Sequence, residues 1–161
     1  MEVNTKKIVF AALVLLLSLS FSPYVLFAQT QDDEEEMVES LFQIEKKAII
    51  VDNMGFTEDE SKAFWPVYNE FQQARQKLTE RTIKVLKDYM NAYDTLSNEQ
   101  AGAILKEYVA IEKDRADLKA EYLPKFDKML PAKKVARYYQ IENKIEAILK
   151  YQLAREVPLV K

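Results

Sequence analysis

The residues of this chain whose types could carry out chemistry are carboxylates, lysines and arginines, because the sequence contains neither cysteine nor histidine. Their absence excludes thiol nucleophiles, Ser-His triads, disulfides and zinc sites built from Cys and His. A glycosidase-like carboxylate pair would need a concave pocket that holds both groups at a fixed separation. We instead expect Glu107, Glu112 and Asp114 to be solvated or paired with nearby lysines. The sequence therefore predicts no catalytic residue, no metal site and no cofactor.

A basic stretch is the strongest candidate for a binding surface. Its members are Arg75, Lys77, Arg81, Lys84 and Lys87. One interpretation is a hydrated helix face that offsets the acidic segments. The other is a basic, partly apolar surface that gathers an acidic client by long-range attraction and retains it by apolar contacts. For the second interpretation, the residues we expect to contact a client are Arg75, Arg81, Lys84, Tyr89, Tyr93 and Arg115.

The overall composition narrows the class of protein. The 161 residues carry a formal net charge of −3, which disfavours nucleic acid as the main partner because phosphate binding needs a concentrated basic surface. Only two glycines occur, while Lys, Glu, Leu and Ala are abundant. This composition favours an all-α protein over a sheet with tight turns.

Two capping boxes indicate where helices begin. Thr57 is followed three residues later by Glu60, so each can bond the other's backbone N–H, and Ser97 with Gln100 repeats the pattern. After the first box, apolar residues recur at three- and four-residue steps and predict a helix from Glu58 to about Asp94. Pro66 lies inside this helix and predicts a kink near its start.

Three further helices complete the expected fold. Apolar periodicity predicts a helix over 37–53 that ends at Gly55, a third after Ser97 that ends by Lys128, and a fourth from Leu130-Pro131 that stops at Pro158. Short connections then give an elongated, all-α four-helix hairpin or bundle with one long kinked helix. We expect it to dimerise, because the long helix exposes apolar area that a second copy could cover.

An aromatic cluster lies near the start of the long helix, formed by Phe64, Trp65, Tyr68 and Phe71. Their helical spacing favours core packing against the first helix over a binding role.

The N-terminal segment carries an export pattern. Residues 1–28 pair a short basic region with an apolar run, which is typical of a signal peptide cleaved near Ala28. The alternative is an uncleaved membrane anchor, because a membrane-spanning helix needs about 20 residues and the apolar run is that long. Residues 29–36 are acidic and predict a flexible segment. The helical domain then covers 37–157, and 158–161 form a tail.

The two helix starts also carry a family resemblance. Leu96-Ser97-Asn98-Glu99-Gln100 matches an LTxxQ motif with Ser in place of Thr, and 56–60 matches it more loosely, with Phe for Leu and Glu for Gln. The chain resembles the Spy/CpxP family of periplasmic proteins, which carry this motif twice, over most of residues 38–155. The positions that carry the resemblance are Phe56, Thr57, Glu60, Leu96, Ser97 and Gln100.

The resemblance implies a thin, curved helical dimer in the periplasm. Some members of the family are ATP-independent chaperones, so we expect a chaperone-like protein that binds unfolded or stressed envelope proteins. The alternative is an envelope-stress regulatory adaptor that binds a sensor protein, or a metal-responsive sensor, although metal-responsive relatives often use the histidine that is absent here. A third class is a membrane-anchored structural module, if the N-terminal segment is retained.

Overall fold

The computed structural model describes residues 42–161. In that range the protein is all-α and contains no strand, and no helix there is both long and apolar enough to cross a membrane. The helices span 42–54, Glu58–Ala92 (α3), Asn98–Asp127 (α4) and Ala132–Glu156 (α5). The predicted all-α class is confirmed. The predicted signal peptide, the acidic segment 29–36 and the start of the first helix lie outside the described residues.

The chain divides into two compact units, one ending at Gly55 and the other spanning Phe56–Lys161. In the first unit, helix 42–54 stops where expected. Gly55 has a φ of 53°, a left-handed conformation that glycine adopts without a Cβ clash. The Asn53 amide also donates a 2.7 Å hydrogen bond to the Ile49 carbonyl in the last turn.

In the second unit, both predicted capping boxes are present. Glu60 N donates to Thr57 Oγ1 at 3.2 Å, and Thr57 N donates to the Glu60 carboxylate at 2.8 Å. Ser97 and Gln100 make the same two bonds at 3.2 and 3.0 Å. Each box satisfies backbone donors that the first turn of a helix otherwise leaves without partners. α3 then continues through Pro66 to Ala92 without interruption.

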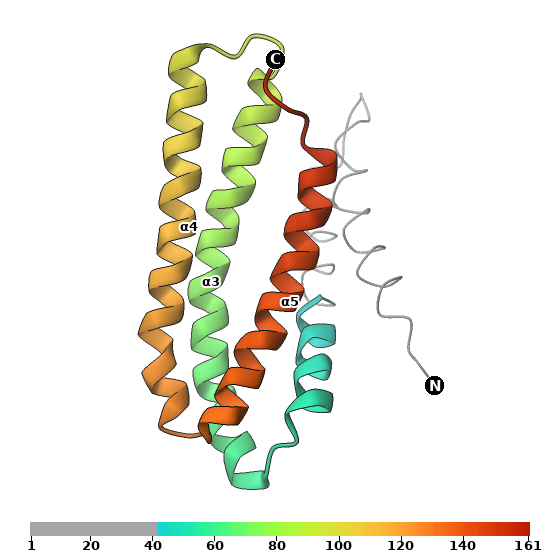
Figure 1. Cartoon of the computed structure of the whole chain (residues 1–161), viewed down its shortest axis with the longest axis vertical. Helices are drawn as coiled ribbons and strands as arrows, with labels where there is room; N and C mark the ends of the chain where they lie inside the picture. The colour runs from blue at the N-terminus through green and yellow to red at the C-terminus, as the bar shows by residue number, and fades with distance from the viewer. Residues whose placement is uncertain (1–41) are drawn as a thin grey trace, which may run out of the picture. The chain divides into compact units, whose positions relative to one another are not determined.

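Figure 1 shows α3 and α4 side by side as an antiparallel hairpin, with α5 returning along it from the short turn after α4. The backbones of α3 and α4 approach closely, whereas α5 and α3 are joined mainly through long side chains. The C-terminus therefore lies beside the end of α3 (Figure 1).

The core is aromatic at the end of this unit near the α4–α5 turn. The Phe126 ring lies 5.6 Å from that of Phe64, 5.9 Å from that of Phe71 and 4.8 Å from that of Tyr138, so all three helices contribute. Tilted and edge-on ring pairs at such distances are favourable beyond their burial alone. The predicted burial of the aromatic cluster is confirmed for Phe64, Tyr68 and Phe71. The ring partners of this cluster include residues of α4 and α5, and its packing against the first helix stays a prediction.

Farther along the hairpin the core is smaller and aliphatic. Leu78 and Val85 of α3 pack with Ile111 of α4, and Ile104 and Leu118 lie against them. These residues lie on the helix faces that the three- and four-residue spacing of apolar residues predicts.

Candidate functional site

Arg75, the first of the predicted client contacts, lies between helices. Its guanidinium pairs with the Glu142 carboxylate of α5, and its side chain is only 15% exposed. Glu142 is 1% exposed, and it also accepts a 3.1 Å hydrogen bond from the Gln72 amide. A second carboxylate, that of Glu146, lies 3.8 Å from the Arg75 guanidinium. The internal partners of Arg75 therefore tie α3 to α5.

Arg115 lies nearby and is also largely buried. Its guanidinium donates to Thr82 Oγ1 at 2.8 Å and to the Leu78 carbonyl at 3.4 Å, both on α3. Burial lowers the pKa of Arg115, and the neighbouring positive charge of Arg75 acts in the same direction. The arginine thus links α4 to α3 and brings a second cation close to the first.

Lys119 and Lys150 extend these contacts to a network across three helices. Lys119 Nζ lies 2.9 Å from the Glu146 carboxylate, and Lys150 Nζ lies 3.2 Å from Glu146 and 2.5 Å from Glu112. We call this set the ion network; its members are Arg75, Glu112, Arg115, Lys119, Glu142, Glu146 and Lys150. It connects α3, α4 and α5 in the middle of the unit.

The ion network strongly lowers the pKa of the Glu146 carboxyl. Burial by itself would raise the pKa of this carboxyl, but the hydrogen bond and charge of Lys119, with Lys150 and Arg75, outweigh burial and lower the pKa to about 2. Glu142 and Glu146 are not among the site residues predicted from the sequence. The signal was present, because Glu142 falls on the apolar seam of its helix and Glu146 follows one turn later on the same side.

Arg81 and Lys84 lie nearer to the surface. Arg81 Nε is 2.9 Å from Glu107 and its Nη1 is 2.6 Å from Asp114, so these two carboxylates pair with an arginine across the hairpin. Both hydrogen bonds raise the pKa of Arg81, that to Glu107 more strongly. Lys84 pairs with Asp88 on its own helix at 2.6 Å and is 75% exposed.

Tyr89 and Tyr93 hold the C-terminal residues against α3. Tyr89 is buried, and its hydroxyl donates a 2.8 Å hydrogen bond to the Pro158 carbonyl. The Tyr93 ring packs edge-on against Tyr89, with centroids 5.8 Å apart, and Lys161 lies over Tyr93 and pairs with Asp94. We call these contacts of residues 157–161 the C-terminal latch. The segment predicted as a tail is thus attached to the helical unit.

The six predicted client contacts therefore do not form one surface. Arg75 and Arg115 meet in the ion network, whereas Tyr89 and Tyr93 belong to the latch. Every one of the six has a partner within the chain, and their contact with a client stays a prediction.

Of the family-like positions, Glu60 has a role that its motif does not reveal. Besides capping α3, its carboxylate lies 2.5 Å from Lys134 Nζ in the first turn of α5. The Lys134 hydrogen bond and the Thr57 backbone N–H lower the pKa of Glu60. Phe56 packs on Phe64 with ring centroids 4.7 Å apart, so this helix start is fixed to the aromatic core.

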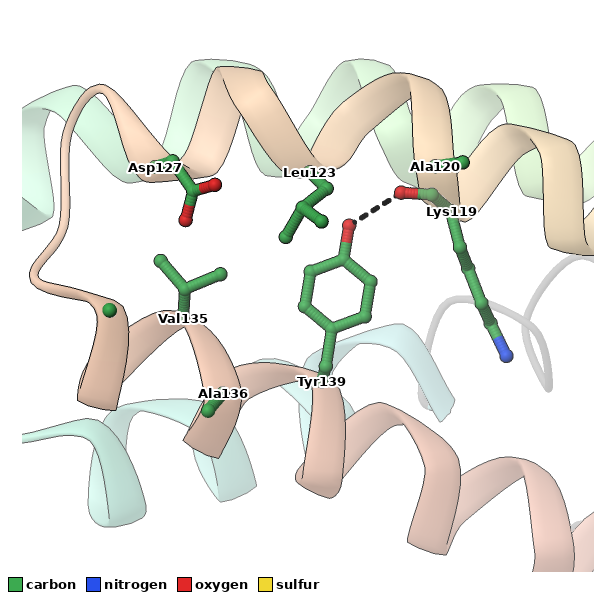
Figure 2. A pocket seen from close by; sticks show the side chains of 8 residues that line it. Lys119, Ala120, Leu123, Asp127, Val135, Ala136 and Tyr139 are labelled. Atoms are coloured by element: carbon green, nitrogen blue, oxygen red, sulfur yellow. Dashed lines mark hydrogen bonds between the residues drawn. The ribbon is translucent and has the colours of Figure 1, made fainter.

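A groove of about 380 Å³ runs between α4 and α5 (Figure 2). We call it the α4–α5 groove; its lining residues are Lys119, Ala120, Leu123, Asp127, Ala132, Val135, Ala136 and Tyr139. The Tyr139 hydroxyl donates to the Lys119 carbonyl at 2.9 Å. Burial raises the pKa of Tyr139 to about 12, and the charge of Asp127 adds to this effect. The sequence did not predict this groove, because its residues come from two helices whose facing sides periodicity does not match.

Large apolar side chains are also exposed on all three helices and on the latch. We call them the exposed apolar surface; they are Ile83, Met90, Leu105, Tyr108, Val109, Leu123, Ile148, Tyr151, Leu159 and Val160. On α4, Leu105, Val109 and Leu123 lie on the same side as the groove residue Ala120, because their spacing returns them to one helix face. This side of α4 therefore presents apolar area to solvent.

The described residues contain no cluster of three or more acidic side chains arranged to hold a metal ion. Comparison with known proteins gives no match: no family model, no curated protein and no solved structure matches this chain.

Proposed function

We propose that this chain is an exported, chaperone-like protein that binds unfolded or stressed envelope proteins without using a nucleotide. The observation that carries the proposal is the exposed apolar surface on three helices. Exposed apolar patches on a protein surface mark sites of interaction with other proteins. On α4, Leu105 and Val109 lie one turn apart on the same helix face and are both exposed. The N-terminal export pattern and the LTxxQ-like helix starts support a periplasmic location and the Spy/CpxP family.

Apolar and charged residues have different roles in this proposed function: apolar side chains retain the client, and charged side chains attract it. Leu105 and Val109 are 61% and 58% exposed, so they are free to retain a nonpolar client segment. The basic stretch of α3, which includes Arg81 and Lys84, is proposed to attract acidic clients at long range. Within the chain, carboxylates across the hairpin and on α3 itself offset the charges of these two residues. Arg75 and Arg115 act indirectly, by holding together the helices that display this surface. An elongated homodimer, in which a second copy covers part of the apolar area, belongs to the same proposal.

The first test is aggregation of two unrelated unfolding proteins, with and without purified residues 29–161, in nucleotide-free buffer. We expect near-stoichiometric suppression of both. Replacing both Leu105 and Val109 by Glu should weaken suppression about tenfold, because burial of two apolar side chains is lost. Ala103→Glu, at another exposed position of α4, is the matched control. Suppression of neither protein would instead favour a regulatory adaptor, which would capture one envelope sensor selectively.

A second test concerns charge. The double variant Arg81→Glu/Lys84→Glu should weaken protection of an acidic client and leave that of a neutral client unchanged. The expected change is about threefold and should shrink as salt is added, because exposed charges are screened. Circular dichroism checks that the helices persist, since Arg81→Glu places a carboxylate beside Glu107 and Asp114. Equal protection of the acidic client would remove both residues from the proposed surface.

A further inference from the structure

The α4–α5 groove has walls of small and apolar side chains. Ala120 and Leu123 form the α4 wall, while Ala132, Val135 and Ala136 form the α5 wall (Figure 2). Three of the lining residues are alanines, whose short side chains leave room between the two helices. Its volume of about 380 Å³ lies in the range of sites that take up small ligands or side chains.

The charge of the groove is concentrated at one end. Figure 2 shows Asp127 near the α4–α5 turn, with Tyr139 and Lys119 farther along. The Lys119 ammonium is engaged by Asn143 and Glu146, at 3.1 and 2.9 Å. Asp127 is the one carboxylate among the described lining residues, and the other residues that line its end of the groove are uncharged.

The position of Asp127 in its helix adds to this negative charge. It is the last residue of α4, where the helix dipole places partial negative charge and favours a cation. Lys125, in the same turn, points to Glu70 at 3.7 Å and lies over the Tyr122 ring, and it does not line the groove. A cation supplied from outside would thus meet a carboxylate and a helix C-terminus together.

We propose that the α4–α5 groove binds segments of other proteins in which an apolar residue is followed or preceded by a lysine or arginine. The apolar side chain lies between Leu123 and Val135, and the basic side chain pairs with Asp127. This inference rests on the proposed function and names its substrate class at one site. The groove and the basic stretch of α3 would then have opposite preferences, because the basic stretch is proposed to attract acidic segments whereas the groove favours basic ones.

The test uses protein expressed from the full chain and short fluorescent peptides of equal length and equal apolar content. The peptides differ at one position, which is Lys, Ser or Glu next to the apolar residues. Fluorescence anisotropy should rank the affinities Lys above Ser above Glu. The Lys peptide should bind about threefold more tightly than the Ser peptide, as expected for one exposed ion pair.

Two variants assign the binding to the groove. Ala136→Phe places a ring in the groove at an exposed position and should weaken binding of all three peptides about tenfold. Asp127→Asn should abolish the preference for Lys over Ser and leave the Ser peptide unchanged. The matched controls are Ala103→Phe and Asp117→Asn, at exposed positions of α4 outside the groove; both should bind as the unaltered protein does.

Three results would overturn the inference: unchanged affinity in folded Ala136→Phe protein, equal affinity for the Lys and Glu peptides, or a change from dimer to monomer in Ala136→Phe with peptide affinity retained. The last would assign the groove to contact between two copies.

Aggregation assays on the same samples separate this inference from the proposed function. If Ala136→Phe protein still suppresses aggregation and binds the peptides with unchanged affinity, the groove inference alone is overturned. Groove-dependent peptide binding without any suppression by the unaltered protein overturns the chaperone proposal alone.

Discussion

The aromatic core near the α4–α5 turn and the ion network in the middle of the helices both join α3, α4 and α5, but by different forces. In the aromatic core, Phe126 contacts rings from all three helices and excludes water. In the ion network, Arg75 and Arg115 are carried into the interior and matched with carboxylates, a hydroxyl and a carbonyl. The first region draws on apolar burial, and the second depends on correct pairing.

This difference shows how α5 is positioned. Apolar packing tolerates replacements of similar volume, so an aromatic core alone specifies the register of a helix loosely. A buried ion pair adds little net stability, because desolvation offsets its attraction, but a mismatch leaves a costly unpaired charge. We infer that the aromatic core supplies most of the stability of this unit and that the ion network selects the register of α5.

The largest expected effect is in the aromatic core. Phe126→Ala should lower the free energy of unfolding by about 3–5 kcal/mol, because it removes a buried ring and leaves a cavity. Urea unfolding followed by circular dichroism measures this loss. Leu123→Ala, at an exposed position one turn earlier on the same helix, should cost less than about 1 kcal/mol. Equal losses for the two variants would contradict the central place of Phe126.

The second-largest expected loss of stability comes from breaking the buried ion pair between Arg75 and Glu142. Glu142→Leu should cost about 3 kcal/mol, because it leaves the Arg75 guanidinium buried without its main carboxylate. The double variant Arg75→Met/Glu142→Leu should recover most of this loss, since no buried charge then lacks its partner. Urea unfolding of the two single variants and the double variant completes the cycle. A double variant as unstable as the sum of the singles would show that the pair is not the source of the cost.

The smallest effect is the dependence on pH. The pKa of Glu146 is about 2 in the folded protein against an ordinary 4.5, so its stabilising contribution is complete above the ordinary value. That contribution is lost as the pH falls from about 4.5 to about 2, because the folded state then gives up a favourable carboxylate. We expect stability to fall by at most about 2 kcal/mol more for the unaltered protein than for Glu146→Gln in this window.

Thermal unfolding at closely spaced pH values measures this difference. Phe126→Ala, which alters only the aromatic core, should retain the full pH dependence and serves as the control. Parallel pH profiles for the unaltered protein and Glu146→Gln would remove Glu146 from the acid response.

Local chemistry explains what the sequence could predict. The capping boxes at Thr57 and Ser97 and the stop at Gly55 depend on residues within one turn of each other, and all three are confirmed. Apolar periodicity likewise placed the helices and indicated that Phe64 and Phe71 are buried. These features require no knowledge of which helix lies opposite.

The candidate site depends on such knowledge, and the sequence did not supply it. Arg75 and Glu142 are 67 positions apart, and periodicity shows the buried face of a helix without naming its partner. The α4–α5 groove could not be predicted for the same reason, because its alanines line a groove only when the two helices lie side by side, and the sequence does not show which helices do so. Arg115 follows the buried Ile111 by four positions and precedes the buried Tyr122 by seven, and this helical spacing was the available sign of an internal role.

The C-terminal latch bears on the order in which the chain becomes structured. Tyr89 donates to the carbonyl of Pro158, 69 positions later, and Lys161 pairs with Asp94. The α3–α4 hairpin is made of neighbouring segments and closes at low entropic cost. The latch contacts, in contrast, form only when residues 157–161 are present and α5 has packed along the hairpin. A chain truncated before residue 157 therefore keeps the residues of its hairpin but leaves the end of α3 without these contacts.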